Sequence, residues 1–258
     1  IHHAIADGMT FARWFANSGS ASAADMDSTP IWLQNEEPVE KPGGGSLVGL
    51  IADAVKMLGG GVRTAIDLTA LSASLVQKSV FERNRDAVLP LAAEKTRFNV
   101  PTGAARNFSI CHYPLPELKA IASSRGASIN DMVMTMCDLA VNRYLAEQGE
   151  EPEQALIPYM TVNLRKDDRH EGNLISLVQV KLASDHDDNL LALEQVRQAS
   201  LSTREIYGSV SRPAIQMYSL LVALLPLGEE LLRLDQLLPP AINLVISNMP
   251  VPSQTMYF

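Results

Sequence analysis

Apolar residues recur along this chain with two spacings, and this patterning constrains the fold more than any other feature. Short apolar runs bounded by loops indicate strands, whereas apolar residues three and four apart indicate helices. We expect strands at 107–113, 157–164, 174–183 and 241–247. A helix is expected to begin at 9–15, directly after the first eight residues, and further helices are expected at 47–58, 62–85, 115–125, 128–144, 190–206, 213–225 and 228–238. Strands interleaved with helices predict an α/β fold, with a mixed sheet and flanking helices.

Two short signals mark the ends of neighbouring helices. Gly126 follows the helix at 115–125, where glycine commonly ends a helix. Ser128 stands three residues before Asp131, which resembles a capping box with aspartate in place of the usual glutamate. A structural role at a helix start is therefore the first interpretation of Asp131.

Composition excludes one class of partner and indicates a compartment. The chain has 258 residues, 47% of them hydrophobic, which is enough for a sizeable core. Its formal net charge of -8 argues against nucleic acid as a partner. Cys111 and Cys137 show no paired or metal-like spacing and lie in apolar segments, so we expect reduced, buried thiols in a cytoplasmic protein.

Low-complexity segments divide the chain. Residues 17–27 are rich in serine, alanine and glycine, and three glycines follow at 43–45. This composition is typical of a linker. We therefore expect an N-terminal part with its linker at 1–45, a helical connector at 46–95, and a second domain at 96–258. The apolar helix at 213–225 is too short to span a bilayer.

The first eight residues hold a compact set of reactive side chains, namely His2, His3, Asp7 and Gly8. A helical turn would place His3 and Asp7 on one face. Three interpretations stay open at this point: satisfied structural histidines, a metal site, or base catalysis by one histidine. The metal site lacks further ligands nearby, since the other histidines lie far along the chain. Histidine is the usual general base at neutral pH.

The motif His-His-x-x-x-Asp-Gly resembles the signature of the CoA-dependent acyltransferase superfamily, which includes chloramphenicol acetyltransferase-like enzymes and condensation domains. Together with three later stations it resembles the bacterial wax ester synthase/acyl-CoA:diacylglycerol acyltransferase family over nearly the whole chain. The stations are Asn130-Asp131, Asn163-Leu164-Arg165 followed by Gly172-Asn173, and Ser247-Asn248-Met249-Pro250. Met249 and Val251 depart from the Ser-Asn-Val-Pro-Gly-Pro that family members usually carry. Because family members are longer, we expect the first domain to lack its beginning and a segment to follow Phe258.

The resemblance implies a chloramphenicol acetyltransferase-like fold and acyl transfer from acyl-CoA to diacylglycerol or a long-chain alcohol. His3 would be the general base and Asn130 the donor to the developing oxyanion. His2 and Asp7 would support the catalytic strand and turn. Gly8, Asp131 and Asn248 would lie next to substrate. The resemblance implies no metal and no cofactor, since acyl-CoA is a substrate. It also implies a cytoplasmic protein, with a peripheral position at the inner membrane or lipid inclusions as a second option.

Two alternatives come from other classes. The chain could be a non-catalytic acyl- or lipid-binding module, although such a module would have no reason to keep His3, Asp7 and Asn130 together. It could also be a condensation-type acyltransferase that takes a carrier-bound substrate. That reading predicts a neighbouring carrier domain, and the later stations do not resemble condensation domains.

Overall fold

The computed structural model describes residues 8–20, 22–24, 30, 62–81, 86–100, 103–163, 175–184, 186–208, 210–232, 237–248 and 257. The chain forms two compact units. The first comprises Ile1–Gly59, Asn163–Ile175 and Ser247–Phe258, and the second comprises Gly60–Val162 and Ser176–Ile246. His2, His3, Asp7 and the helix expected at 47–58 lie outside the described residues.

In the first unit, helix α1 covers Gly8–Asn17 and confirms the helix expected after the N-terminal motif. The hydroxyl of Ser18 donates a hydrogen bond to the carbonyl of Phe15 at 3.0 Å and thereby satisfies one carbonyl of the last turn. Ser20 and Tyr257 form an antiparallel bridge with two backbone hydrogen bonds of 2.8 Å. This bridge brings two segments from opposite ends of the sequence side by side.

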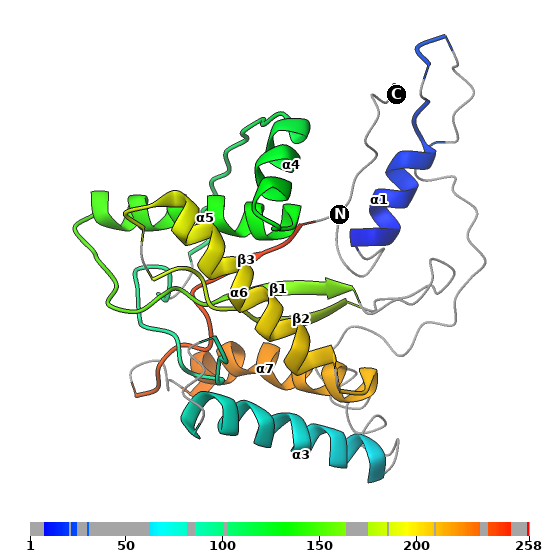
Figure 1. Cartoon of the computed structure of the whole chain (residues 1–258). Coiled ribbons are helices and arrows are strands. Elements are labelled where there is room, and N and C mark those ends of the chain that lie inside the picture. Colours follow the sequence, from blue (N-terminus) through cyan, green and yellow to red (C-terminus); the bar gives the residue numbers. More distant parts are fainter. Residues whose placement is uncertain are drawn as a thin grey trace. The chain divides into compact units, whose positions relative to one another are not determined.

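The second unit is built on a small sheet with the strand order β2-β1-β3 (Figure 1). β1 covers Pro158–Asn163, β2 covers Ile175–Gln179 and β3 covers Leu244–Ile246. β1 and β3 are parallel, with Met160 opposite Ile246. Beyond β2 the chain runs antiparallel to β1, because Val180 donates to the carbonyl of Pro158 and Leu182 to that of Leu156. The sheet is therefore mixed, as the sequence predicted.

Helices pack around this sheet. They are α3 (Val62–Val76), which continues into the π-helical turn η2 (Gln77–Phe81), α4 (Leu115–Ser124), α5 (Ile129–Glu147), α6 (Asn189–Gly208) and α7 (Arg212–Leu232). In Figure 1 the sheet lies between α5 and α7, and α3 runs alongside α7. Strand residues alternate between the faces of a sheet, so Tyr159 bonds to α7 and its neighbour Met160 to α5. The core is apolar, with Leu71, Met134 and Val178 almost completely buried.

Helix α7 corrects two sequence expectations at once. We expected helices at 213–225 and 228–238, separated before Gly228, but α7 is continuous from Arg212 to Leu232 with Pro226 inside it. Proline has no N–H to donate to the carbonyl four residues earlier, here that of Val222. The hydroxyl of Tyr159 donates to this carbonyl at 2.6 Å. Burial, and next the charge of Tyr218, raises the pKa of Tyr159, so its hydroxyl keeps the donated proton. A tertiary contact thus replaces the hydrogen bond whose loss would have favoured a break.

The strand expected at 107–113 is absent from the structure. The segment from 103 to 114 is irregular and exposed throughout, with Phe108 91% exposed and Ile110 70%. An alternating pattern makes a strand only when a neighbouring backbone pairs with it, and no described residue does so. The same segment overturns the expected burial of the cysteines. Both thiols are free as expected, but Cys111 is exposed and Cys137 is partly buried.

No described helix is both long enough and apolar enough to cross a membrane. The leucine-rich part of α7 has one buried face and one exposed face, since Val222 is buried while Leu221 is half exposed. Packing of one face against the core accounts for its hydrophobicity.

Candidate functional site

The amino-terminal end of α5 carries the two described residues of the predicted site that lie together, Asn130 and Asp131. Gly126, with a φ of +62°, ends α4 and turns the chain toward α5. Ser128 then caps α5. Its hydroxyl oxygen accepts from the Asp131 N–H at 3.2 Å, and the Asp131 carboxylate accepts from the Ser128 N–H at 2.8 Å. The predicted capping box is confirmed.

Only one of the two carboxylate oxygens of Asp131 takes part in the capping box. Oδ2 accepts from both the N–H and the hydroxyl of Ser128, the latter at 2.7 Å. Oδ1 is buried, since the residue is only 3% exposed, and it accepts no hydrogen bond from any described residue. Buried polar atoms are nearly always paired. The positive end of the α5 dipole stabilises the carboxylate charge, and Oδ1 remains a strong acceptor for a group outside the described chain.

Asn130 precedes Asp131 in the first turn of α5 and is partly buried. Its amide nitrogen donates to Sδ of Met160 in β1 at 3.0 Å. Met160 is 5% exposed and belongs to the central strand of the sheet. The Asn130 amide therefore links the start of α5 to the sheet. The site thus combines one amide donor with one unpaired carboxylate oxygen on adjacent residues.

A charged pair on α6 lies within electrostatic range of Asp131. Nε and Nη2 of Arg197 donate to the two carboxylate oxygens of Glu194 at 3.0 and 2.9 Å. The hydrogen bond to Glu194, and more weakly the charge of Asp131, raises the pKa of Arg197. Hydrogen bonds from Arg197 first and then from Gln198 lower the pKa of Glu194 to about 2. Both partners are therefore ionised at neutral pH, and Glu194 offsets the positive charge beside Asp131.

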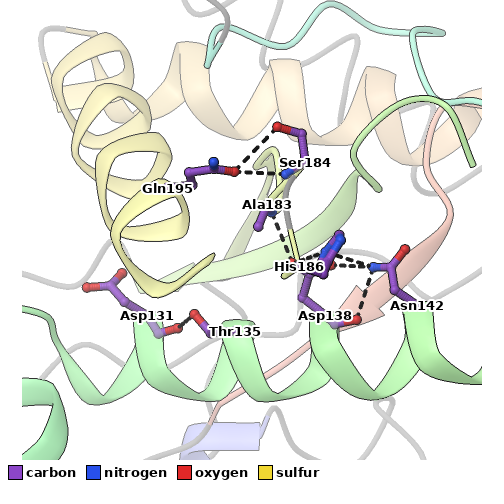
Figure 2. A network of polar contacts seen from close by, with 8 residues as sticks. All are labelled: Asp131, Thr135, Asp138, Asn142, Ala183, Ser184, His186 and Gln195. Carbon is purple, nitrogen blue, oxygen red and sulfur yellow. Dashed lines mark hydrogen bonds and ion pairs between the residues drawn. The ribbon is translucent and has the colours of Figure 1, made fainter. Parts of the chain in front are cut away.

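A second buried carboxylate, Asp138, lies further along α5 and is fully paired (Figure 2). Its Oδ1 accepts from the Asn142 amide at 2.7 Å. Its Oδ2 accepts from the Ala183 N–H at 3.0 Å and lies 3.2 Å from Nε2 of His186, which must carry the proton of this contact. Asp138 thus fastens the segment after β2 to α5.

The segment after β2 is also hydrogen-bonded to a side chain of α6. Oε1 of Gln195 accepts from the Ser184 N–H at 2.9 Å (Figure 2). An open depression of about 1290 Å³ borders this region, and its lining includes Arg143, Glu147, Glu150 and Asp187.

The other predicted site residues are distributed as follows. Gly8 is the first residue of α1, and Asn248 is exposed two residues after β3 ends at Ile246. Both belong to the first unit, whereas Asn130 and Asp131 belong to the second. The structure therefore brings together Asn130 and Asp131 and leaves the roles of His2, His3, Asp7, Gly8 and Asn248 as predictions.

Two contacts of α5 were missed from the sequence. Met160 has the pattern of an ordinary apolar strand residue, and no local signal links it to Asn130. His186, one of the histidines far along the chain from His2 and His3, contacts Asp138 from a position 48 residues away. A buried aspartate in the middle of an apolar helix was the available signal, because such a group needs partners.

Comparison with known proteins identifies the family. A model of the wax ester synthase/diacylglycerol acyltransferase catalytic domain matches residues 1–133, and a model of the C-terminal domain of the same family matches residues 171–258. A probable diacylglycerol O-acyltransferase of Mycobacterium tuberculosis is 28% identical over 268 aligned positions, which cover all of this chain and 56% of the relative. The O-acyltransferase WSD of Acinetobacter baylyi is 26% identical, with the same coverage. The chain thus spans about half the length of the curated relatives it matches.

A solved structure supports the fold. The wax ester synthase/diacylglycerol acyltransferase of Marinobacter aquaeolei VT8 matches all of this chain and 50% of its own, with a TM-score of 0.56 and 19% identity. The predicted fold class is therefore confirmed. Since the catalytic-domain model matches half of the chain and the C-terminal-domain model follows it in order, this chain belongs to the wax ester synthase/diacylglycerol acyltransferase family.

Proposed function

We propose that the protein transfers a long-chain acyl group from acyl-CoA to the hydroxyl of diacylglycerol or a fatty alcohol, and so forms triacylglycerol or a wax ester. The observation that carries this proposal is the combination, within a chain of this family, of an amide donor and a buried carboxylate oxygen that no described residue pairs with, both at the start of α5. A structural helix cap needs the Ser128–Asp131 pair but has no use for either of these two features.

The proposed reaction is a single displacement. His3 removes the proton of the hydroxyl as its oxygen attacks the thioester carbonyl carbon. A carbon–oxygen bond forms, and the carbonyl electron pair moves onto oxygen. When this pair returns, the carbon–sulfur bond breaks and the CoA thiolate leaves with the proton that His3 holds. A positioned general base of this kind contributes about a hundredfold to ten-thousandfold in rate, and the reaction requires no cofactor.

Asn130 would donate its amide N–H to the tetrahedral oxyanion. Such a donor acts where negative charge develops, and its removal typically costs about a hundredfold or more in turnover. Asp131 would keep the helix start in place through Oδ2 and accept a hydrogen bond from a bound substrate group through Oδ1. His2 and Asp7 would support the turn that carries His3, and Gly8 and Asn248 would lie next to substrate.

The test measures CoA release with a thiol-reactive dye in the full-length protein, using palmitoyl-CoA with hexadecanol or a diacylglycerol. We expect release to depend on the acceptor, to disappear in His3→Ala, and to fall about a hundredfold in Asn130→Ala. Thermal unfolding of each variant checks that the fold is intact. Release without any acceptor would indicate a thioesterase, and no release at all would favour a binding module or a carrier-dependent enzyme.

A further inference from the structure

The side-chain amide of Asn130 donates its hydrogen bond to an unusual acceptor. Within the described part of the chain, its one side-chain hydrogen bond goes to the thioether sulfur of Met160, at 3.0 Å. A thioether is a weak acceptor, whereas a partly buried amide is a strong donor that usually finds an oxygen. The sulfur therefore orients the amide but holds it with little energy.

Met160 is itself held firmly. It is 5% exposed and lies in β1, where it is paired with Ile246 of β3. The preceding residue, Tyr159, anchors the opposite face of β1 to the Val222 carbonyl of α7. Because neighbouring strand residues point to opposite faces, this anchor keeps the Met160 side chain directed at the start of α5.

We infer that Met160 is a positioning residue: its weak bond orients the Asn130 amide, yet lets the amide turn one of its two N–H groups toward the oxyanion as it forms. This inference rests on the proposed role of Asn130. A hydrogen bond to an oxyanion is roughly twice as strong as a neutral one, so exchange of sulfur for oxyanion is favourable. A strong acceptor at position 160 would retain the amide in the ground state. An apolar residue there would leave the amide unoriented, and orientation before the reaction is what makes such donors effective.

Substitutions of Met160 separate these effects. Met160→Gln offers a carbonyl oxygen to Asn130, and we expect kcat to fall about fivefold to tenfold, the effect of one ordinary hydrogen bond, while KM for palmitoyl-CoA changes less than twofold. Met160→Leu removes the sulfur at nearly constant volume, and we expect kcat to fall about threefold. Met217→Leu is the matched control, because Met217 is equally buried but belongs to α7 rather than to β1 or the start of α5. Its kinetics should equal those of the wild type.

Combination with Asn130→Ala decides whether Met160 acts through Asn130. In that background Met160→Gln should have no further effect on kcat, since the partner is gone. Thermal unfolding of the same variants identifies any loss that comes from misfolding. An unchanged kcat in Met160→Gln, or an equal fall in both backgrounds, would overturn the inference. Wild-type turnover in Asn130→Ala alone would instead refute the proposed function of Asn130.

Discussion

Two buried aspartates on one helix differ in how many of their carboxylate oxygens are hydrogen-bonded. Asp138 is completely buried, and its oxygens are paired with Asn142, Ala183 and His186. Asp131, two turns earlier on α5, is nearly as buried but leaves Oδ1 without a partner among the described residues. A fully paired carboxylate stabilises the fold, whereas an unpaired buried one is costly and is kept when something else uses it. We therefore expect Asp138 to stabilise the fold and Asp131 to serve the proposed site.

The largest effect that tests this comparison is expected at Asp138. Asp138→Ala leaves the buried Ala183 N–H without its acceptor and removes the carboxylate that also contacts His186, while the Asn142 amide keeps only the backbone carbonyl of residue 138. We expect the free energy of unfolding to fall by about 3 kcal/mol or more, measured by urea denaturation of the full-length protein. Glu147→Ala is the control on the same helix, because its ion pair with Arg143 is exposed and should change stability by less than about 0.5 kcal/mol. A loss below about 1 kcal/mol at Asp138 would contradict the structural assignment.

A second substitution should separate activity from stability at Asp131. Asp131→Asn can still accept from Ser128 through its carbonyl oxygen, but its amide nitrogen replaces the unpaired Oδ1 with a donor. We expect the free energy of unfolding to change by less than about 1 kcal/mol, while kcat/KM falls about tenfold. Urea denaturation and the CoA-release assay measure the two quantities. Normal turnover with a large loss of stability would reverse the comparison, because Asp131 would then be only a cap.

The smallest effect is expected at His186. His186→Ala removes one of the partners of Asp138, but Asn142 and Ala183 remain, and the partly exposed position admits water. We therefore expect a loss of about 1 kcal/mol in the free energy of unfolding. His112→Ala, in the exposed segment before α4, is the matched control and should have no measurable effect. Equal losses at both histidines would mean that the contact with Asp138 contributes nothing.

Local chemistry made much of this molecule predictable. The capping box was readable because Ser128 and Asp131 satisfy each other within one turn, whatever surrounds them. Helices α4 and α6 and the strands of the mixed sheet followed from apolar spacing, and the family followed from short motifs in a constant order.

Predictions failed where the outcome depended on a distant partner. Pro226 continues α7 because Tyr159, from another part of the chain, donates to the carbonyl that proline cannot serve. The alternating segment at 107–113 is not a strand because no described backbone pairs with it. In both cases the local pattern allowed two structures, and a tertiary contact decided between them.

The sequence by itself therefore determined the family, the elements with strong local signals, and the identity of Asn130 and Asp131 as candidates. Only the tertiary structure decided which aspartate has both carboxylate oxygens paired, that the Asn130 amide donates to Met160, and that His186 contacts Asp138. The physical reason is that hydrogen bonds of buried side chains join residues far apart in the chain, and a one-dimensional pattern carries no information about which of them meet.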